Sequence, residues 1–309
     1  MITSVFKKST PINYSFIGIL MVFVFFTYQL QDTKWTSSLF EIAKKSALLL
    51  ILFASLFISN FIVKKNALTK DSAYTILFFF IFLMFFPNVL DNYKLIVSNF
   101  FILLAMRRLV SLQTLKAPKE KIFDASLWIF VASLFHFWAI LFILLVYISI
   151  IFHVSRDYRN WLIPFVALFS SSIIFVFYAL LFDKEAIDVY FQSEVINLQV
   201  DYFTNNYQNI AFSIYVVFAV FFVLPYLFTL TNKPLNLQAS YKKVLLAFFI
   251  GMAIFFISAN KSNEVLVYTF LPIAIMATNT VEYLQNKIQQ EIILFVSIIC
   301  GVFCFFSQL

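Results

Sequence analysis

The sequence predicts an all-α fold: a polytopic transmembrane helix bundle of about 11 spans, with the N-terminus inside and the C-terminus outside. The chain is 62% hydrophobic and only 12% charged, whereas soluble domains average roughly 25% charged residues. Its mean hydropathy is +0.93, and long apolar stretches recur from one end to the other with short polar segments between them. Residues 1–309 are therefore expected to form a single integral membrane domain.

The first four expected spans are residues 14–30, 46–63, 73–90 and 95–112. Each is an apolar run close to the roughly 20 residues that a helix needs to cross the ~30 Å hydrocarbon core. The fourth span ends in Arg107 and Arg108, which with Lys116, Lys119 and Lys121 form the densest basic patch of the chain.

The apolar stretch at residues 122–153 fixes the orientation of everything after it. It contains 32 residues, which as one helix would be about 48 Å long. We predict instead two short spans of ~22 Å each, joined by a turn at Phe135-His136-Phe137. Lys and Arg collect in cytoplasmic loops, and two crossings place six of the downstream Lys and Arg residues inside and two outside. A single crossing would invert that ratio.

The remaining expected spans are residues 161–182, 210–230, 244–258, 265–281 and 292–306. In this arrangement 16 Lys and Arg lie inside and 6 outside, while 6 carboxylates lie inside and 9 outside. The pI of about 9.2 then follows from membrane insertion and from contact with anionic lipid of the inner leaflet. It requires no nucleic-acid partner.

Two outer loops, residues 31–45 and 183–209, carry apolar residues at helical spacing. The stripes are Trp35, Leu39, Ile42 and Ala43 in the first loop, and Ile187, Tyr190, Phe191, Val195 and Leu198 in the second. Such amphipathic helices either anchor the bundle at the membrane surface or cover a site that opens outwards.

In the second interpretation, Asp32 and Glu41 are the candidate catalytic carboxylates. Positive charge for a phosphate would come from Lys94 and Lys261, with Lys44 and Lys45 beside them. His136, at the predicted turn, is a further candidate for substrate binding, because an imidazole can titrate or bind a phosphate. A histidine at such a turn also commonly serves only to hydrogen-bond the backbone.

Other kinds of site are not indicated. Cys300 and Cys304 are four residues apart on an apolar helix, where we expect them to pack rather than pair, and no metal-ligand spacing occurs. We therefore expect no metal and no cofactor. Ionisable groups at mid-membrane depth and Gly-interrupted helices, both typical of ion-coupled transporters, are missing.

Parts of the sequence resemble known families. The segments MITSVFKKSTPINYSF, RRLVSLQTLKAPKEKIFDASLWIFVASLFHF and FLPIAIMA resemble an uncharacterised family of multi-pass inner-membrane proteins found in Bacteroidota, over essentially the whole chain. That resemblance implies a bacterial inner (plasma) membrane location.

More distantly, SANK ending at Lys261 and YTFLPIAI beginning at Tyr268 are similar to a late segment of membrane glycosyltransferases of the GT-C fold. This second resemblance implies a polyprenyl-phosphate-linked sugar substrate, with Asp32 or Glu41 as catalytic carboxylate and Lys261 as lipid-phosphate ligand. The first outer loop here has only 15 residues.

The function expected from these observations is the handling of a cell-envelope glycan or lipid-linked sugar at an outward-facing site. The first alternative is a non-enzymatic scaffold or accessory subunit of an envelope membrane complex, with envelope proteins as partners; the second is a transporter. A catalyst should bring Asp32 or Glu41 into one cavity with Lys261, whereas a scaffold should hold them apart on the surface.

Overall fold

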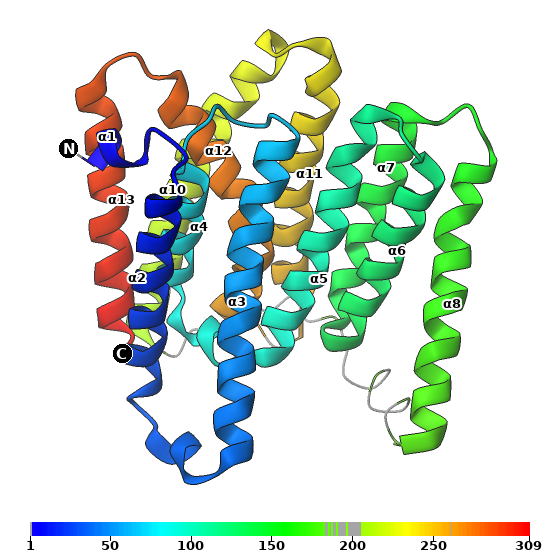
Figure 1. Ribbon diagram of the computed structural model, residues 1–309, viewed down its shortest axis with the longest axis horizontal. Helices are drawn as coiled ribbons and strands as arrows, with labels where there is room; N and C mark the ends of the chain where they lie inside the picture. Colours follow the sequence, from blue (N-terminus) through cyan, green and yellow to red (C-terminus); the bar gives the residue numbers. More distant parts are fainter. Residues whose placement is uncertain are drawn as a thin grey trace.

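The computed structural model describes residues 2–182, 185, 187, 190, 196, 205–259 and 261–309. Within these residues the protein is helical and has no β-strand (Figure 1). The α-helices are α1 (Ile2–Phe6), α2 (Pro11–Gln29), α3 (Leu39–Lys65), α4 (Tyr74–Phe85), α5 (Tyr93–Val110), α6 (Pro118–Phe135), α7 (Ile143–His153), α8 (Arg159–Phe182), α10 (Asn206–Thr229), α11 (Leu235–Ile257), α12 (Phe270–Tyr283) and α13 (Lys287–Ser307). Short 3-10 helices join them: η1 (Thr33–Ser37), η2 (Pro87–Leu90), η3 (Ser111–Thr114), η4 (Phe137–Phe142), η5 (Leu230–Asn232) and η6 (Asn263–Thr269).

Apart from the five-residue α1, the described α-helices correspond one to one with the predicted spans. Among the described residues, eight helical segments are long and apolar enough to cross a membrane. The other three are α4, α6 and the η4–α7 segment. Helix α4 has only 12 residues, and α6 begins with the charged run Lys119-Glu120-Lys121. The helical fold class is thus confirmed, while the count of 11 crossings stays a prediction.

The core of the bundle is built on α4 and α12. Every residue of α4 is buried, and 89% of the apolar window in Asn263–Tyr283 is buried inside the protein. A helix surrounded by other helices does not have to match the bilayer thickness, because its backbone groups are bonded within the helix and its ends meet protein. This explains how a 12-residue helix can lie at the centre of the bundle.

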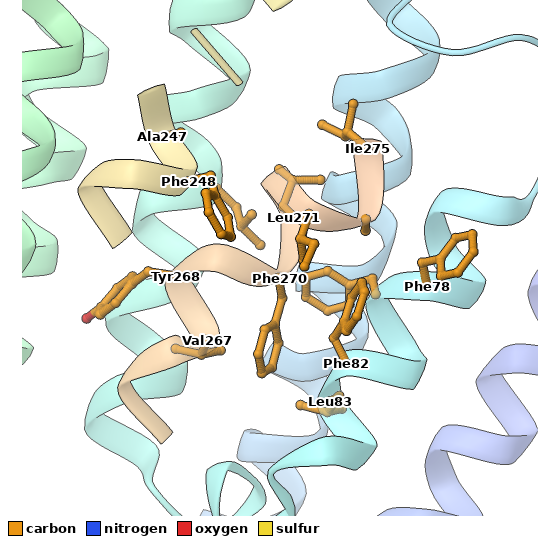
Figure 2. Packing of buried hydrophobic residues seen from close by; sticks show 14 of the residues in the cluster. Phe78, Phe82, Leu83, Ala247, Phe248, Val267, Tyr268, Phe270, Leu271 and Ile275 are labelled. Carbon is orange, nitrogen blue, oxygen red and sulfur yellow. The ribbon is translucent and has the colours of Figure 1, made fainter. Parts of the chain in front are cut away.

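Aromatic rings fill the space between α4, α10 and α12. Phe79 of α4 lies 6.3 Å from Phe270 of α12 in an edge-on arrangement, and Figure 2 shows Phe82 of α4 and Phe270 in the same cluster of buried side chains. The Phe82 ring lies 5.9 Å from Tyr215 of α10 in an edge-on arrangement, and Phe86 stacks on Phe270 at 6.2 Å. Offset and edge-on aromatic pairs contribute beyond the area they bury, so the abundant phenylalanine of this chain has a packing role here.

The chain doubles back at His136, as predicted. Helix α6 ends at Phe135, His136 has an extended backbone (φ −145°, ψ 106°), and η4 begins at Phe137. The His136 carbonyl accepts a hydrogen bond from the Ala139 amide at 3.0 Å, which closes the turn. Helices α6 and α7 then lie side by side, and the more exposed α8 packs against them at the edge of the bundle (Figure 1).

The bundle has two distinct ends. One, the basic end, holds α1 and the connections at residues 66–73, 111–117, 154–158, 230–234 and 284–286. The other, the pocket end, holds the connections at residues 30–38, 86–92 and 136, residues 258–259 and 261–262, and the C-terminus. A polar contact at each end ties a connection to a neighbouring helix: Lys70 to Glu282 of α12 at the basic end, and Asn92 to Glu264 of η6 at the pocket end.

The predicted outer loops differ in how far they can be described. In the first loop, Thr33–Ser37 forms η1, and the following helix begins at Leu39 rather than at residue 46. Leu39, Ile42 and Ala43 therefore form the first turns of the 27-residue α3 instead of a separate surface helix. The amphipathic helix predicted within residues 183–209 lies largely outside the described residues.

Candidate functional site

A polar pocket of about 460 Å³ lies at the pocket end, between α2, η1, α3 and the start of α5. It is lined by Tyr28, Gln29, Gln31, Asp32, Trp35, Glu41, Lys44, Lys45, Leu48, Asp91 and Tyr93. Its volume falls in the range of roughly 300–1,000 Å³ that is usual for small-molecule sites. We call this cavity the polar pocket.

Local sequence signals shape one wall of the polar pocket. Ser38 caps the N-terminus of α3, where its hydroxyl accepts a hydrogen bond from the Glu41 amide at 3.2 Å. An N-cap serine starts a helix because it satisfies an amide that has no partner within the helix. The Trp35 indole donates to the Gln29 carbonyl at 3.1 Å and so ties η1 to the end of α2. Asp32 is held between these two elements.

The charges of the polar pocket are arranged in pairs. Lys44 Nζ lies 3.7 Å from Glu41 Oε2 and 5.4 Å from the centre of the Tyr93 ring. Lys45 forms a salt bridge with Asp91, which joins α3 to the connection before α5. Carboxylates and ammonium groups thus alternate around a space that aromatic rings border. Such a lining can accept hydrogen bonds from hydroxyl groups and also stabilise an anion.

The structure brings some of the predicted site residues together and separates others. Asp32 and Glu41 line the same pocket. Lys94 is exposed in the first turn of α5, beside the pocket residue Tyr93 but not itself in the lining. Lys261 is buried in the connection between α11 and η6, and it is not among the residues that line the polar pocket.

His136 lies apart from the polar pocket. Its ring is 5.7 Å from that of Tyr268, at the turn between α6 and η4. The ring nitrogen Nε2 is buried and has no hydrogen-bond partner among the described residues. His136 therefore belongs to the aromatic packing at the turn, and its role in substrate binding stays a prediction.

Sequence reasoning missed three residues at or beside the polar pocket. Asp91 and Tyr93 fall between the expected spans 73–90 and 95–112 and were not among the candidate site residues, yet both line the pocket. Glu264 precedes the expected span at residues 265–281, and it accepts a hydrogen bond from Asn92 at 2.5 Å. Asp91 follows a Pro-Asn break near the outer end of a span, and that polar cluster was the available signal.

No group of three or more His, Cys, Asp or Glu residues that could hold a metal occurs in the part of the chain that the structure describes. The eight apolar helices of membrane-spanning length in the described part of the chain indicate a membrane protein. The chain belongs to a family of unknown function (DUF6427), which it matches over residues 6–309. No curated protein and no solved structure matches it.

Proposed function

We propose that this protein handles a lipid-linked sugar of the cell envelope, which it binds in the polar pocket on the outer face of the bacterial inner membrane. The observation that carries the proposal is the convergence of Asp32 and Glu41 in one cavity with Lys44 and Lys45. The proposed orientation of the bundle in the membrane rests on charge. The basic end collects most of the Lys and Arg residues, and such ends face the cytoplasm.

The surroundings of the polar pocket suit an amphiphilic substrate. Leu39 is 86% exposed and Phe40 is 75% exposed, one turn or less from Glu41 on α3. An apolar chain can follow this surface into the bilayer while its polar head enters the pocket. Trp35 and Tyr93 add aromatic faces, which can pack against the apolar side of a sugar ring.

A glycosyl transfer of the GT-C kind would use these groups in a defined way. A carboxylate, Asp32 or Glu41, takes the proton from an acceptor hydroxyl as that oxygen attacks the sugar carbon. The bond between the sugar carbon and the phosphate oxygen breaks, and the lipid phosphate leaves with the electron pair. Lys44 and Lys45 line the pocket and are placed to stabilise that charge, whereas Lys261 is not in the lining.

The test compares lipids that co-purify in mild detergent. Wild-type protein should retain polyprenyl-phosphate sugar, detected by mass spectrometry, and the D32N/E41Q variant should lose most of it. The variant Glu120→Gln is a matched control, because Glu120 is an exposed carboxylate in the first turn of α6 at the basic end. Identical lipid content in all three proteins would overturn the proposal.

A second test addresses catalysis. In a strain that depends on this protein, Asp32→Asn or Glu41→Gln should abolish function while the amount of protein in the membrane stays unchanged. If each single variant fully complements the strain, the two carboxylates are not catalytic, and binding is the only role left for the polar pocket.

One observation favours a scaffold as the second candidate function. Only 17% of the apolar window of α8 is buried within the protein, and the helix lies at the edge of the bundle (Figure 1). An accessory subunit would use such a helix to pack against a partner in the envelope complex. Substitutions along α8 that release co-purifying proteins and leave lipid content unchanged would support this candidate.

A further inference from the structure

A second cavity, of about 400 Å³, lies at the basic end of the bundle, on the opposite side from the polar pocket. It is lined by Phe61, Lys65, Asn66, Arg107, Arg108, Ser111, Thr114, Lys116 and Lys121. Five of these nine residues are Lys or Arg, and none is Asp or Glu. We call this cavity the basic pocket.

The backbone at the basic pocket gathers cations from three elements. Lys65 ends α3, Arg107 and Arg108 lie in the last turn of α5, and Lys121 lies in the first turn of α6. Lys116 lies in the connection between α5 and α6. Its two neighbours in the sequence, Leu115 and Ala117, both have left-handed backbone conformations (φ 54° and 44°). Residues other than glycine rarely adopt that conformation. The chain thus holds an uncommon turn that keeps Lys116 at the cavity.

These cations lie close to one another. The Arg107 guanidinium is 4.8 Å from the centre of the Phe61 ring, and Lys65 Nζ is 5.1 Å from the same centre. The two charges are therefore no more than about 10 Å apart, which is within one Debye length at moderate salt. Partial burial, followed by the charges of Arg108, Lys65 and Lys116, lowers the pKa of Lys121.

Neighbouring negative charge does not balance the basic pocket. Helices α3 and α5 both end here, and each C-terminus carries the equivalent of about half a negative charge. Arg108 is paired with Asp124 at 2.7 Å. Lys121 is bonded to the Ser111 carbonyl at 2.7 Å and to the Thr114 hydroxyl at 2.8 Å. The two helix C-termini and Asp124 together supply about two negative charges, so the five cations of the basic pocket leave a surplus of about three positive charges.

We infer that the basic pocket binds the phosphate group of an anionic ligand. Phosphate suits a cluster that contains both guanidinium and ammonium groups, because Arg can donate two parallel hydrogen bonds and Lys adds a point charge. Leu115 is 57% exposed and Phe61 is 40% exposed beside the cavity, so the ligand can be a lipid headgroup whose chains continue along this apolar surface. A free phosphate has the same recognition chemistry, and experiment distinguishes the two sources.

The test variant is K65Q/K116Q, because both side chains are exposed and neither forms an ion pair that fastens two helices in the described residues. Arg108 and Lys121 are kept, since their bonds hold α6 in place. The matched control is K8Q/K287Q, which removes two exposed lysines from the same end of the protein but outside the basic pocket. All proteins are purified in neutral detergent, and their melting temperatures without ligand should agree.

Ligand binding is measured as the rise in melting temperature with short-chain phosphatidylglycerol, with phosphatidylcholine or with inorganic phosphate. A basic residue near an anionic surface contributes about 1 kcal/mol, so removing two lysines should weaken binding by roughly 30-fold. A rise with phosphatidylglycerol in wild type and control, but not in K65Q/K116Q, supports the site with a lipid as its ligand. The same pattern with inorganic phosphate supports a free anion.

Equal stabilisation of all three proteins by phosphatidylglycerol would overturn the inference. If phosphatidylcholine stabilises wild type as much as phosphatidylglycerol does, the inference is overturned as well, because the protein then recognises the acyl chains and not the anionic charge. The outcome is independent of the polar pocket, because none of these substitutions touches it.

Discussion

Lys119 Nζ lies 3.1 Å from Asp157 Oδ2, and this ion pair joins the first turn of α6 to the connection that follows α7. Nearly all of α6, the turn at His136 and α7 lie between the two residues in the sequence, yet they meet at one end of the bundle. The contact therefore shows that the chain returns to the end from which it started. It also places Asp157 within the strongly basic end of the protein.

This pair predicts a pH dependence. The hydrogen bond from Lys119, followed by that from the Arg159 amide, lowers the pKa of Asp157. A carboxyl group whose pKa is lower in the folded state stabilises the fold above its unfolded pKa, which is about 4, and loses that contribution as the pH falls through the folded value. Wild type should therefore lose more stability than Asp157→Asn between pH 6 and pH 3.

Thermal unfolding in detergent across that pH range measures the effect. Glu120→Gln serves as the control, because it removes a neighbouring exposed carboxylate that is not in this ion pair. If the pH profiles of wild type and Asp157→Asn coincide, the Lys119–Asp157 pair does not stabilise the hairpin.

The salt bridge between Lys45 and Asp91 predicts an energetic coupling across the polar pocket. It is partly exposed, with side-chain exposures of 15% and 54%, so each single variant, Lys45→Gln or Asp91→Asn, should cost about 0.2–1 kcal/mol. The double variant should cost less than the two single costs together, because the second change removes a group that has already lost its partner. Denaturation in mixed micelles measures the three costs.

The neighbouring Lys44 supplies the control for this double-mutant cycle of Lys45 and Asp91. Lys44 is next to Lys45 on α3 but lies near Glu41 instead of Asp91. Lys44→Gln and Asp91→Asn should therefore be additive. Coupling of the same size in both cycles would mean that the pocket responds to net charge rather than to the specific pair.

Gly251 predicts a packing limit between α11 and η6. A Cβ added at Gly251 would lie 2.7 Å from Thr269 Cγ2 and 3.3 Å from the Tyr268 carbonyl carbon. Thr269 cannot move easily, because its hydroxyl donates to the Leu266 carbonyl at 2.5 Å and bonds to the Tyr215 hydroxyl. Gly251→Ala should therefore lower stability by about 1–3 kcal/mol.

Gly18→Ala is the matched control for that prediction. The added Cβ would meet only the edge of the Phe53 ring, at 3.3 Å, and a partly buried ring can shift by a few tenths of an ångström. Thermal unfolding should show little change for Gly18→Ala and a clear loss for Gly251→Ala. A similar result for both would contradict the close approach of α11 to η6.

The apolar pattern was sufficient to predict every helix outside α1, because membrane-length apolar runs separated by charged segments are a strong signal in a chain with 12% charged residues. The turn at His136 was predicted from length and charge alone. Helix ends were less predictable. The apolar stripe at Leu39, Ile42 and Ala43 indicated a helix in the first loop, but the charged residues Lys44 and Lys45 hid that it continues into the span as α3, which Ser38 caps.

The site was harder to predict, because it depends on which distant residues the packing brings together. Asp32 and Glu41 are close in sequence, and their convergence needed only a short loop. Lys261 was grouped with them by its expected side of the membrane, a criterion too coarse to fix a contact. Lys243 was placed before a span, yet it is fully buried, with Nζ donating to the Leu109 carbonyl at 2.5 Å and 3.1 Å from His153 Nε2.

The most direct test of the account is a map of which end of the bundle faces which compartment. Single cysteines at Lys116, Arg156 and Lys94 are introduced into a C300A/C304A background and exposed to a membrane-impermeant maleimide in intact bacterial spheroplasts. We predict labelling at position 94 only, with positions 116 and 156 labelled after the membrane is permeabilised. Labelling of position 156 but not 116 in intact spheroplasts would contradict the hairpin at His136, and the outward-facing polar pocket with it.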